Sequence, residues 1–163
     1  MFKGAITAIV TPFTEKGELD KESLRKLVEF QIKNKIDGIV PCGTTGESPS
    51  LNEEEHYEVI EIVIDVAKGK VPVIAGAGSS STQHAIEMTK KAAEIGADAS
   101  LHVCPYYNKP TQEGLYRHFS EIAKAVDIPI IIYNIQGRTA VNMETSTLAK
   151  LTKEYSNIVG VKE

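Results

Sequence analysis

Residues 99–134, ASLHVCPYYNKPTQEGLYRHFSEIAKAVDIPIIIYN, contain two short apolar runs with one amphipathic segment between them. The runs cover 99–104 and 128–134, and their length and composition are typical of buried parallel strands. Between them, four apolar residues recur at helical spacing and form a single stripe: Leu115, Phe119, Ile122 and Val126. This stretch therefore predicts a strand, a helix and a second strand parallel to the first.

The same unit repeats along the chain. Further apolar runs begin near Ala5, Ile36, Val71 and Asn157, so that the six runs start 28 to 35 residues apart. The segments between them have helix-start signals, which are Asp20, the pair Asn52 and Glu55 in a capping box, and the pair Ser80 and Gln83. Gly69 and Gly96 mark helix ends, and Leu148, Leu151 and Tyr155 give a last, shorter stripe. The sequence thus predicts an α/β fold with six parallel strands and five helices.

Two architectures fit this order, a doubly wound open sheet and a (β/α)₈ TIM barrel. An open sheet collects its ligand contacts where the strand order reverses, whereas a barrel takes them from the ends of several strands. Here polar residues follow nearly every run, as in Gly43–Glu47, Gly78–Ser79, Pro105–Tyr107, Tyr133–Asn134 and Lys162. This distribution favours the barrel.

A closed barrel of this type needs eight strands, and residues 1–163 supply six. The chain stops at Glu163, directly after an apolar run, and an open arc of six strands has two unpaired edges and an uncovered apolar face. We therefore expect residues 1–163 to be the N-terminal portion of a single barrel domain, with Lys162 at the end of the sixth strand. The C-terminal strands and a helical tail are expected to be missing.

Composition excludes several functional classes. The 163 residues carry 18 Lys and Arg against 22 Asp and Glu, and this net charge of −4 does not predict binding to nucleic acid or an anionic membrane. No apolar run is long enough to cross a bilayer, and the start lacks the pattern of a signal peptide. Two cysteines without a partner motif argue against a disulfide scaffold. We expect a cytoplasmic protein.

Several strand-end residues are candidates for chemistry. A desolvated Lys162 would have a lowered pKa and a free amine able to attack a carbonyl, although a lysine that merely begins a loop is the commoner case. Tyr133 and Tyr107 can transfer protons at an imine, or can simply pack. Thr44 and Thr45 lie between two glycines and can present donors to a small carboxylate, although such loops are usually plain turns.

Arg138 is a candidate partner for a second carboxylate, because guanidinium and carboxylate form a bidentate pair; a surface ion pair is the alternative. Gly76 and Gly78 give only a weak indication of a phosphate-binding turn.

The four histidines form no metal-binding pattern. His84 and His118 are predicted on solvated helix faces and His102 inside a strand. Packing is the expected role of Cys42 and Cys104.

Taken together, these segments resemble the dihydrodipicolinate synthase family, within the pyruvate-dependent class I aldolase superfamily. The resemblance rests on matching segments along the whole chain: AIVTPF, GTTGESPSLNEEEH, VIAGAGSSST, GAD, PYYNKPTQEGLYRHF, IIIYNIQGRT and IVGVKE. GTTGE, YN and GVKE indicate the superfamily. PYYNKPTQEGL and the segment around Arg138 narrow the match to the synthase.

The resemblance implies an aldolase-type lyase that condenses pyruvate with L-aspartate 4-semialdehyde, on the diaminopimelate route to lysine. Lys162 would form the Schiff base with pyruvate, and Tyr133 would shuttle protons at the imine. Thr44 would link Tyr133 to Tyr107 in a hydrogen-bonded relay. No metal or separate cofactor is implied beyond the covalent pyruvate imine.

The same resemblance assigns the substrate carboxylates and the assembly. Thr45 would hold the carboxylate of pyruvate, and Arg138 would hold that of the aldehyde. The tyrosine that matches Tyr107 enters the site from a neighbouring subunit in this family, which implies a homo-oligomer, usually a dimer of dimers.

Some positions depart from the family pattern. Gln136 stands where proline is usual, so the backbone before Arg138 is expected to differ. Ser48, His56 and Tyr106 fit a possible allosteric lysine site, but Glu53 and His84 argue against feedback inhibition.

Two alternatives stay open. One is a sister enzyme, of the N-acetylneuraminate lyase or keto-deoxy-sugar aldolase type, which generally lacks an arginine at the position of Arg138. The other is a non-catalytic truncated barrel fragment whose open edge pairs with a complementary fragment or with itself.

Overall fold

The structure, a computed structural model, describes residues 2–163, which form two compact units. The first unit runs as far as Gly76 and includes Glu94–Asp98. The second unit comprises Ala77–Ala93 and Ala99–Glu163. Within the described residues, no helix combines the length and the apolar character that crossing a membrane requires.

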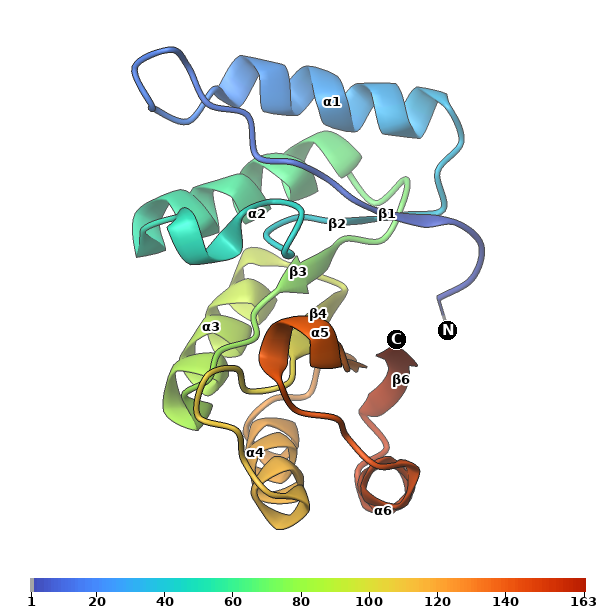
Figure 1. The fold of residues 1–163 in the computed structure, drawn as a ribbon. Coiled ribbons are helices and arrows are strands. Elements are labelled where there is room, and N and C mark those ends of the chain that lie inside the picture. The colour runs from blue at the N-terminus through green and yellow to red at the C-terminus, as the bar shows by residue number, and fades with distance from the viewer. Residues whose placement is uncertain (1) are drawn as a thin grey trace. The chain divides into compact units, whose positions relative to one another are not determined.

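The first unit contains three short parallel strands with two long helices packed beside each other (Figure 1). Ile6 is in register with Gly38 on the neighbouring strand, and a parallel bridge between Ile39 and Val73 continues the pairing. Its elements are β1 (Ile6–Ala8), α1 (Lys21–Lys33), β2 (Gly38–Val40), the 3₁₀ turn η1 (Ser48–Ser50), α2 (Glu53–Ala67) and β3 (Ile74–Gly76).

Both helices of the first unit begin where their capping residues predict. The Asp20 side chain accepts the N–H of Ser23 at 2.9 Å and caps α1. At α2, the Asn52 side chain accepts the N–H of Glu55, and the Glu55 carboxylate accepts the N–H of Asn52, both at 2.9 Å. Each bond satisfies a backbone donor that the first turn of a helix leaves without a partner.

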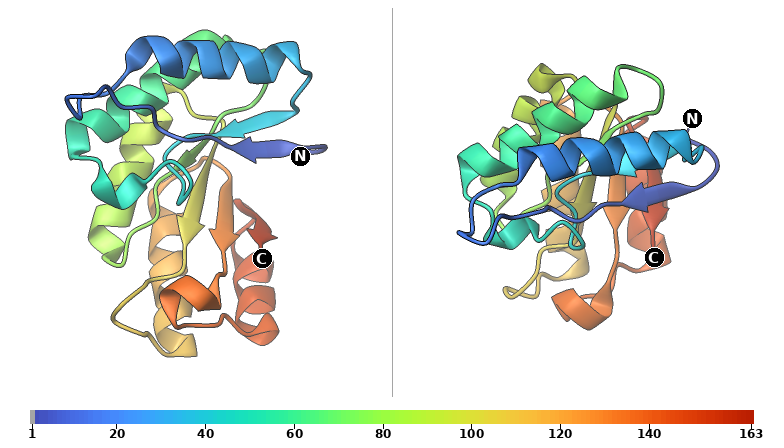
Figure 2. Two further views of the ribbon diagram at one scale, coloured as in Figure 1. Left: turned by 45° about the horizontal axis from the view of Figure 1, so that its top comes forward. Right: turned by 90° about the horizontal axis from the view of Figure 1, so that it is seen from above.

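The second unit contains three parallel strands that lie side by side, with helices packed against them (Figure 2). Ser100 pairs with Ile130, and Tyr133 pairs with both Val103 and Lys162 on its two neighbours. Its elements are α3 (Thr82–Ile95, all but the last two residues), β4 (Ala99–Val103), α4 (Gln112–Ala125), β5 (Ile130–Tyr133), α5 (Gln136–Thr139), α6 (Thr145–Glu154) and β6 (Ile158–Lys162).

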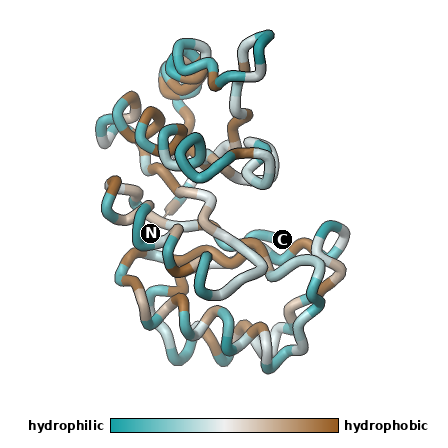
Figure 3. Tube along the Cα trace, turned by 90° about the vertical axis from the view of Figure 1, so that its left-hand side faces the viewer, coloured by the Kyte–Doolittle hydropathy of each residue, from teal (hydrophilic) through white to brown (hydrophobic). Residues whose placement is uncertain are grey.

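The apolar stripe of α4 forms the core of the second unit. Leu115, Phe119 and Ile122 are fully buried and pack with Ile130 and Ile132 of β5. Figure 3 shows hydrophobic and hydrophilic residues alternating along the turns of the helices.

The pairing of β5 with β6 contains one irregularity. Ile130 is in register with Ile158, but the next residue, Ile131, is in register with Gly160, so Val159 is an extra residue on β6. From there the pairing continues regularly, and Lys162 comes opposite Tyr133. An extra residue of this kind moves every later side chain of its strand to the other face.

The six predicted strands and five predicted helices are confirmed, with small corrections. The helix predicted from Ser80 begins later, because Ser81 supplies the capping hydroxyl, which accepts the N–H of His84 at 3.4 Å. The one-turn helix α5 was not predicted, since four residues are too few to show a helical period. His118 was predicted on a solvated face and is instead buried.

Candidate functional site

Lys162 and Tyr133 come together at the ends of two paired strands. The Lys162 Nζ atom lies 3.5 Å from the centroid of the Tyr133 ring, and Asn134 donates its backbone N–H to the Lys162 carbonyl at 2.9 Å. Tyr133 is buried. The structure therefore places an amine, which can form an imine with a carbonyl, directly over a phenol ring, which can transfer protons.

Among residues 2–163 the side chain of Lys162 is exposed, and its desolvation, which was expected for a lysine facing the interior of a closed barrel, stays a prediction. β6 pairs with β5 along one edge, and no described strand pairs with its other edge. Val159 and Val161 of the same strand are exposed for the same reason.

Arg138 lies on α5, which follows β5 directly, and its side chain is exposed. The alternative of a surface ion pair finds no support, since none of the described carboxylates pairs with it. Gln136 is the first residue of α5, where a backbone N–H has no helical acceptor and proline is also tolerated. Gln136 in place of proline is therefore compatible with a helical backbone before Arg138.

Thr44 and Thr45 belong to a tight loop of the first unit, and both are exposed. The N–H of Gly46 donates to the Gly43 carbonyl at 3.1 Å, and the Thr11 hydroxyl donates to the Gly46 carbonyl at 2.7 Å. These bonds hold the loop in place and leave the two threonine side chains on its surface.

Gly76 holds the same loop close to the end of β3. A Cβ atom at Gly76 would lie 1.9 Å from the Cys42 carbonyl oxygen, and one at Gly78 would lie 2.5 Å from the backbone nitrogen of Val103. Both glycines are thus explained by close approach of two backbones, and the weak indication of a phosphate-binding turn is not needed.

Tyr107 is 93% exposed and has a left-handed backbone with φ of 72°. Residues with a Cβ rarely adopt this region, and a bulky aromatic residue does so only when its surroundings hold it there. Nearby, the Asn108 side chain donates to the Ser80 carbonyl at 3.3 Å, and its N–H donates to the Tyr106 carbonyl at 2.9 Å. The loop therefore presents an aromatic side chain away from its own unit.

Two of the three possible allosteric residues lie together. Ser48 Oγ lies 3.5 Å from His56 Nδ1, and His56 Nε2 lies 2.8 Å from the Gly76 carbonyl. His56 is buried, so its ring already has protein groups at both nitrogens. Tyr106 belongs to the second unit and is half-buried.

The second unit buries two histidines. His102 lies 2.9 Å from Ser100 Oγ through Nε2, and His118 Nδ1 lies 2.9 Å from Thr82 Oγ1. Burial, with the charge of His118 as a smaller cause, lowers the pKa of His102 to about 3, and burial lowers that of His118 to about 4. Both rings are therefore neutral at physiological pH.

Cys42 and Cys104 are buried free thiols, as predicted. Burial raises the pKa of Cys42, and burial with the nearby charge of Glu163 raises that of Cys104 to about 12. Both therefore stay protonated near neutral pH, which suits packing. Among residues 2–163, no cluster of three or more His, Cys, Asp or Glu side chains is arranged to hold a metal ion.

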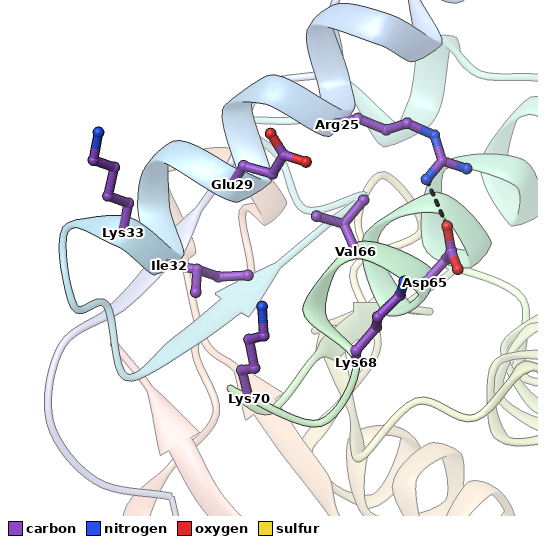
Figure 4. Close-up of a pocket in the computed structure, with 8 residues that line it drawn as sticks. All are labelled: Arg25, Glu29, Ile32, Lys33, Asp65, Val66, Lys68 and Lys70. Atoms are coloured by element: carbon purple, nitrogen blue, oxygen red, sulfur yellow. Dashed lines mark hydrogen bonds and ion pairs between the residues drawn. The ribbon is translucent and has the colours of Figure 1, made fainter.

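An open cleft of about 440 Å³ lies between the C-terminal ends of α1 and α2 (Figure 4). Arg25 pairs with Asp65 across it at 2.5 Å, and Ile32 and Val66 form its apolar part. None of the predicted site residues lines this cleft, so it is separate from the candidate chemistry.

Comparison with known proteins assigns the chain to a family. The model of the dihydrodipicolinate synthetase family matches residues 1–163. The chain belongs to this family. Among curated relatives, the 4-hydroxy-tetrahydrodipicolinate synthases of Syntrophus aciditrophicus and Syntrophobacter fumaroxidans are 62% and 60% identical over all 163 residues. The chain spans about half the length of these relatives, 55% in both cases.

The solved structures of the family agree with this assignment. The chloride-inhibited dihydrodipicolinate synthase from Acinetobacter baumannii, solved in complex with pyruvate, is 52% identical and superposes with a TM-score of 0.97. The match covers 99% of this chain and 55% of that one. The fold is therefore part of a (β/α)₈ barrel, as predicted.

Proposed function

We propose that this chain carries the Schiff-base lysine of a 4-hydroxy-tetrahydrodipicolinate synthase, an aldolase-type lyase that joins pyruvate to L-aspartate 4-semialdehyde. The observation that carries the proposal is the position of Lys162 Nζ, 3.5 Å from the Tyr133 ring centroid. Relatives at about 60% identity with this activity support it. In the same proposal, residues 1–163 are the N-terminal portion of one barrel domain.

The first step is attack of the uncharged Lys162 amine on the C2 carbonyl carbon of pyruvate. The carbinolamine that forms loses water to give an imine, and the phenol of Tyr133 supplies the proton that the departing hydroxyl needs. Loss of a proton from the pyruvate methyl group then converts the imine to an enamine. Thr44 and Tyr107 are proposed to relay these protons, and Thr45 to bind the pyruvate carboxylate.

The second step joins the two substrates. The enamine carbon attacks the aldehyde carbon, the aldehyde oxygen takes up a proton and becomes a hydroxyl, and the imine re-forms on Lys162. The amino group of the condensed substrate then attacks the imine carbon and displaces the lysine, which closes the ring. Arg138 is proposed to bind the carboxylate of the aldehyde, because its guanidinium group is exposed and makes no ion pair with described residues.

Trapping with borohydride tests the lysine. The protein is incubated with pyruvate and borohydride, its intact mass is measured, and Lys162→Ala is treated identically. One reduced pyruvate on the wild type and none on the variant is the expected result. A wild-type protein that is folded by circular dichroism and gains no mass would refute the proposal.

The aldehyde preference tests the substrate. Arg138→Lys keeps the charge but loses the planar fork, so we expect a higher KM for aspartate 4-semialdehyde and unchanged trapping of pyruvate. A preference for sugar-derived aldehydes would instead indicate a sister enzyme of the sialic acid lyase type.

We also propose a homo-oligomer, a dimer of dimers, in which Tyr107 serves a neighbouring subunit. Its 93% exposure and left-handed backbone support a role outside its own unit. Mixing Tyr107→Phe subunits with Lys162→Ala subunits tests this. In a mixed oligomer, the intact Lys162 of one subunit meets the intact Tyr107 of the other, so a shared site regains activity that neither variant has alone. Mixtures no more active than their components would contradict it.

Cytoplasmic location and insensitivity to lysine stay predictions. Cell fractionation tests the first, and titration of the active enzyme with L-lysine tests the second.

A further inference from the structure

The side-chain amide of Asn134 is a buried hydrogen-bond junction that the sequence analysis did not assign. The residue is 4% exposed and directly follows β5. Its Nδ2 donates to Asn142 Oδ1 at 2.8 Å and to the Glu163 carboxylate at 3.0 and 3.3 Å. Its Oδ1 accepts the backbone N–H of Met143 at 2.9 Å. The Cys104 thiol, 3.9 Å from Oδ1, completes the surroundings.

These partners allow only one orientation of the amide. The Glu163 carboxylate only accepts hydrogen bonds, and the Met143 N–H only donates one. A rotated amide would put Oδ1 against the carboxylate and Nδ2 against the N–H, so both bonds would be lost. An aspartate at the same position has the same shape but no donor to offer.

The junction joins two segments that carry proposed site residues. The backbone N–H of Asn134 holds the Lys162 carbonyl, and its side chain holds Glu163, the next residue. On the other side, Asn142 and Met143 end the segment that begins with α5 and contains Arg138. Both segments are thus anchored to the end of β5, next to Tyr133.

A second amide holds the far side of the same segment. Gln112, the first residue of α4, donates through Nε2 to the Asn142 carbonyl at 2.8 Å. Its Oε1 accepts the N–H of Glu144 at 3.0 Å and the hydroxyl of Thr147 at 2.7 Å. Gln112 thus fixes the segment that contains Arg138 to α4. The hydrogen bonds of Asn134 connect the same segment to β6, the strand of Lys162.

We propose that Asn134 is a positioning residue, which holds the Lys162 end of β6 and the Arg138 segment in a fixed relation through its amide bond to Glu163. The inference deepens the proposed function and rests on it. A small displacement of a reacting amine slows its reaction strongly. We therefore expect loss of the Asn134 bonds to lower the rate at which Lys162 forms the imine with pyruvate.

Exchanging donor and acceptor across this pair separates positioning from simple stability. Asn134→Asp places two carboxylates in contact and removes the donor, and we expect pyruvate trapping on Lys162 to slow about tenfold. In the double variant Asn134→Asp with Glu163→Gln, the new amide donates to the new carboxylate. Trapping is then expected to return to within about threefold of the wild-type rate, because the bond between positions 134 and 163 re-forms in reverse, although the bond to Asn142 Oδ1 does not.

Asn157→Asp is the matched control. The Asn157 amide also donates two hydrogen bonds, to the Ala123 and Val126 carbonyls at 2.9 Å, but at the other end of β6. Its loss lowers stability without touching the Lys162 end, so trapping is expected to keep the wild-type rate while the protein is folded.

The experiment measures the rate of pyruvate trapping by intact mass in the natural full-length protein, with circular dichroism on each variant. Asn134→Asp reacting at the wild-type rate would overturn the inference, as would slow trapping in a folded double variant or an equal loss in Asn157→Asp. If Asn134→Asp does not fold, the trapping rate of the double variant, compared with that of the wild type, decides the question by itself. A folded wild type that traps no pyruvate overturns the proposed function itself, an outcome distinct from the others.

Discussion

Acidification is expected to destabilise the protein through His118, by an amount that the structure allows to be worked out. Burial holds the pKa of this histidine at about 4, against an ordinary value of 6.5. As the pH falls below 6.5, the unfolded chain takes up a proton that the folded chain still refuses, so stability decreases with falling pH until the folded pKa is reached. The contribution of the neutral His118 ring to the free energy of unfolding is therefore complete above pH 6.5 and is lost as the pH falls towards 4.

The size follows from proton linkage. A pKa lowered from 6.5 to about 4 corresponds to about 3 kcal/mol of unfolding free energy over the whole window. Between pH 7.5 and pH 5, about 2 kcal/mol of this is lost. His102 contributes a loss in the same direction, since its pKa is also lowered.

Urea unfolding at fixed protein concentration, repeated between pH 5 and pH 7.5, measures the effect. His118→Asn keeps a polar group near Thr82 but does not titrate, so the wild type should lose about 2 kcal/mol more than this variant over the window. Exposed His84→Asn serves as the control and should follow the wild type. Parallel pH dependence of the wild type and His118→Asn would refute the argument.

Four further substitutions test the packing and one helix cap. Gly76→Ala forces a methyl group to 1.9 Å from the Cys42 carbonyl and should cost more than about 2 kcal/mol by thermal unfolding, whereas Gly137→Ala meets nothing within 4 Å and should be nearly neutral. Phe119→Ala removes a fully buried ring from the core and should cost about 3–5 kcal/mol by urea unfolding. Asn52→Ala breaks the capping box of α2 and should cost about 1 kcal/mol, so an unchanged melting temperature would contradict that role.

The sequence predicts those parts of the fold that depend on local pattern. Helix α4 was found because its apolar residues recur at helical spacing, and α2 because a capping box is a short-range arrangement. Burial of His118 was missed because only apolar residues were counted. Its position, three residues after Leu115 and four before Ile122, puts it on the same face of the helix and would have indicated a buried side chain.

The candidate site was less predictable because its contacts join distant segments. Asn134 bonds with Asn142 and Glu163, which lie 8 and 29 residues away, and nothing in a single sequence marks such a pair. The exposure of Lys162 likewise depends on what lies beside β6, and a local apolar pattern does not reveal that. Lys162 and Tyr133 were both expected at strand ends from the apolar runs before them, and parallel pairing of β5 with β6 brings the two ends to the same edge.

The extra residue Val159 determines which residue of β6 comes opposite Tyr133, and so the face of the sheet on which the Lys162 amine lies. In a regular pairing, Lys162 would come opposite Asn134 and its side chain would leave the sheet on the face away from Tyr133. Removing Val159 would instead give a regular pairing that still has Lys162 opposite Tyr133, because every later residue of β6 keeps its partner on β5. The position of the amine therefore depends on where the irregularity lies: Val159 has to stay outside the pairing with Ile131, since pairing with it would move Lys162 one position beyond Tyr133.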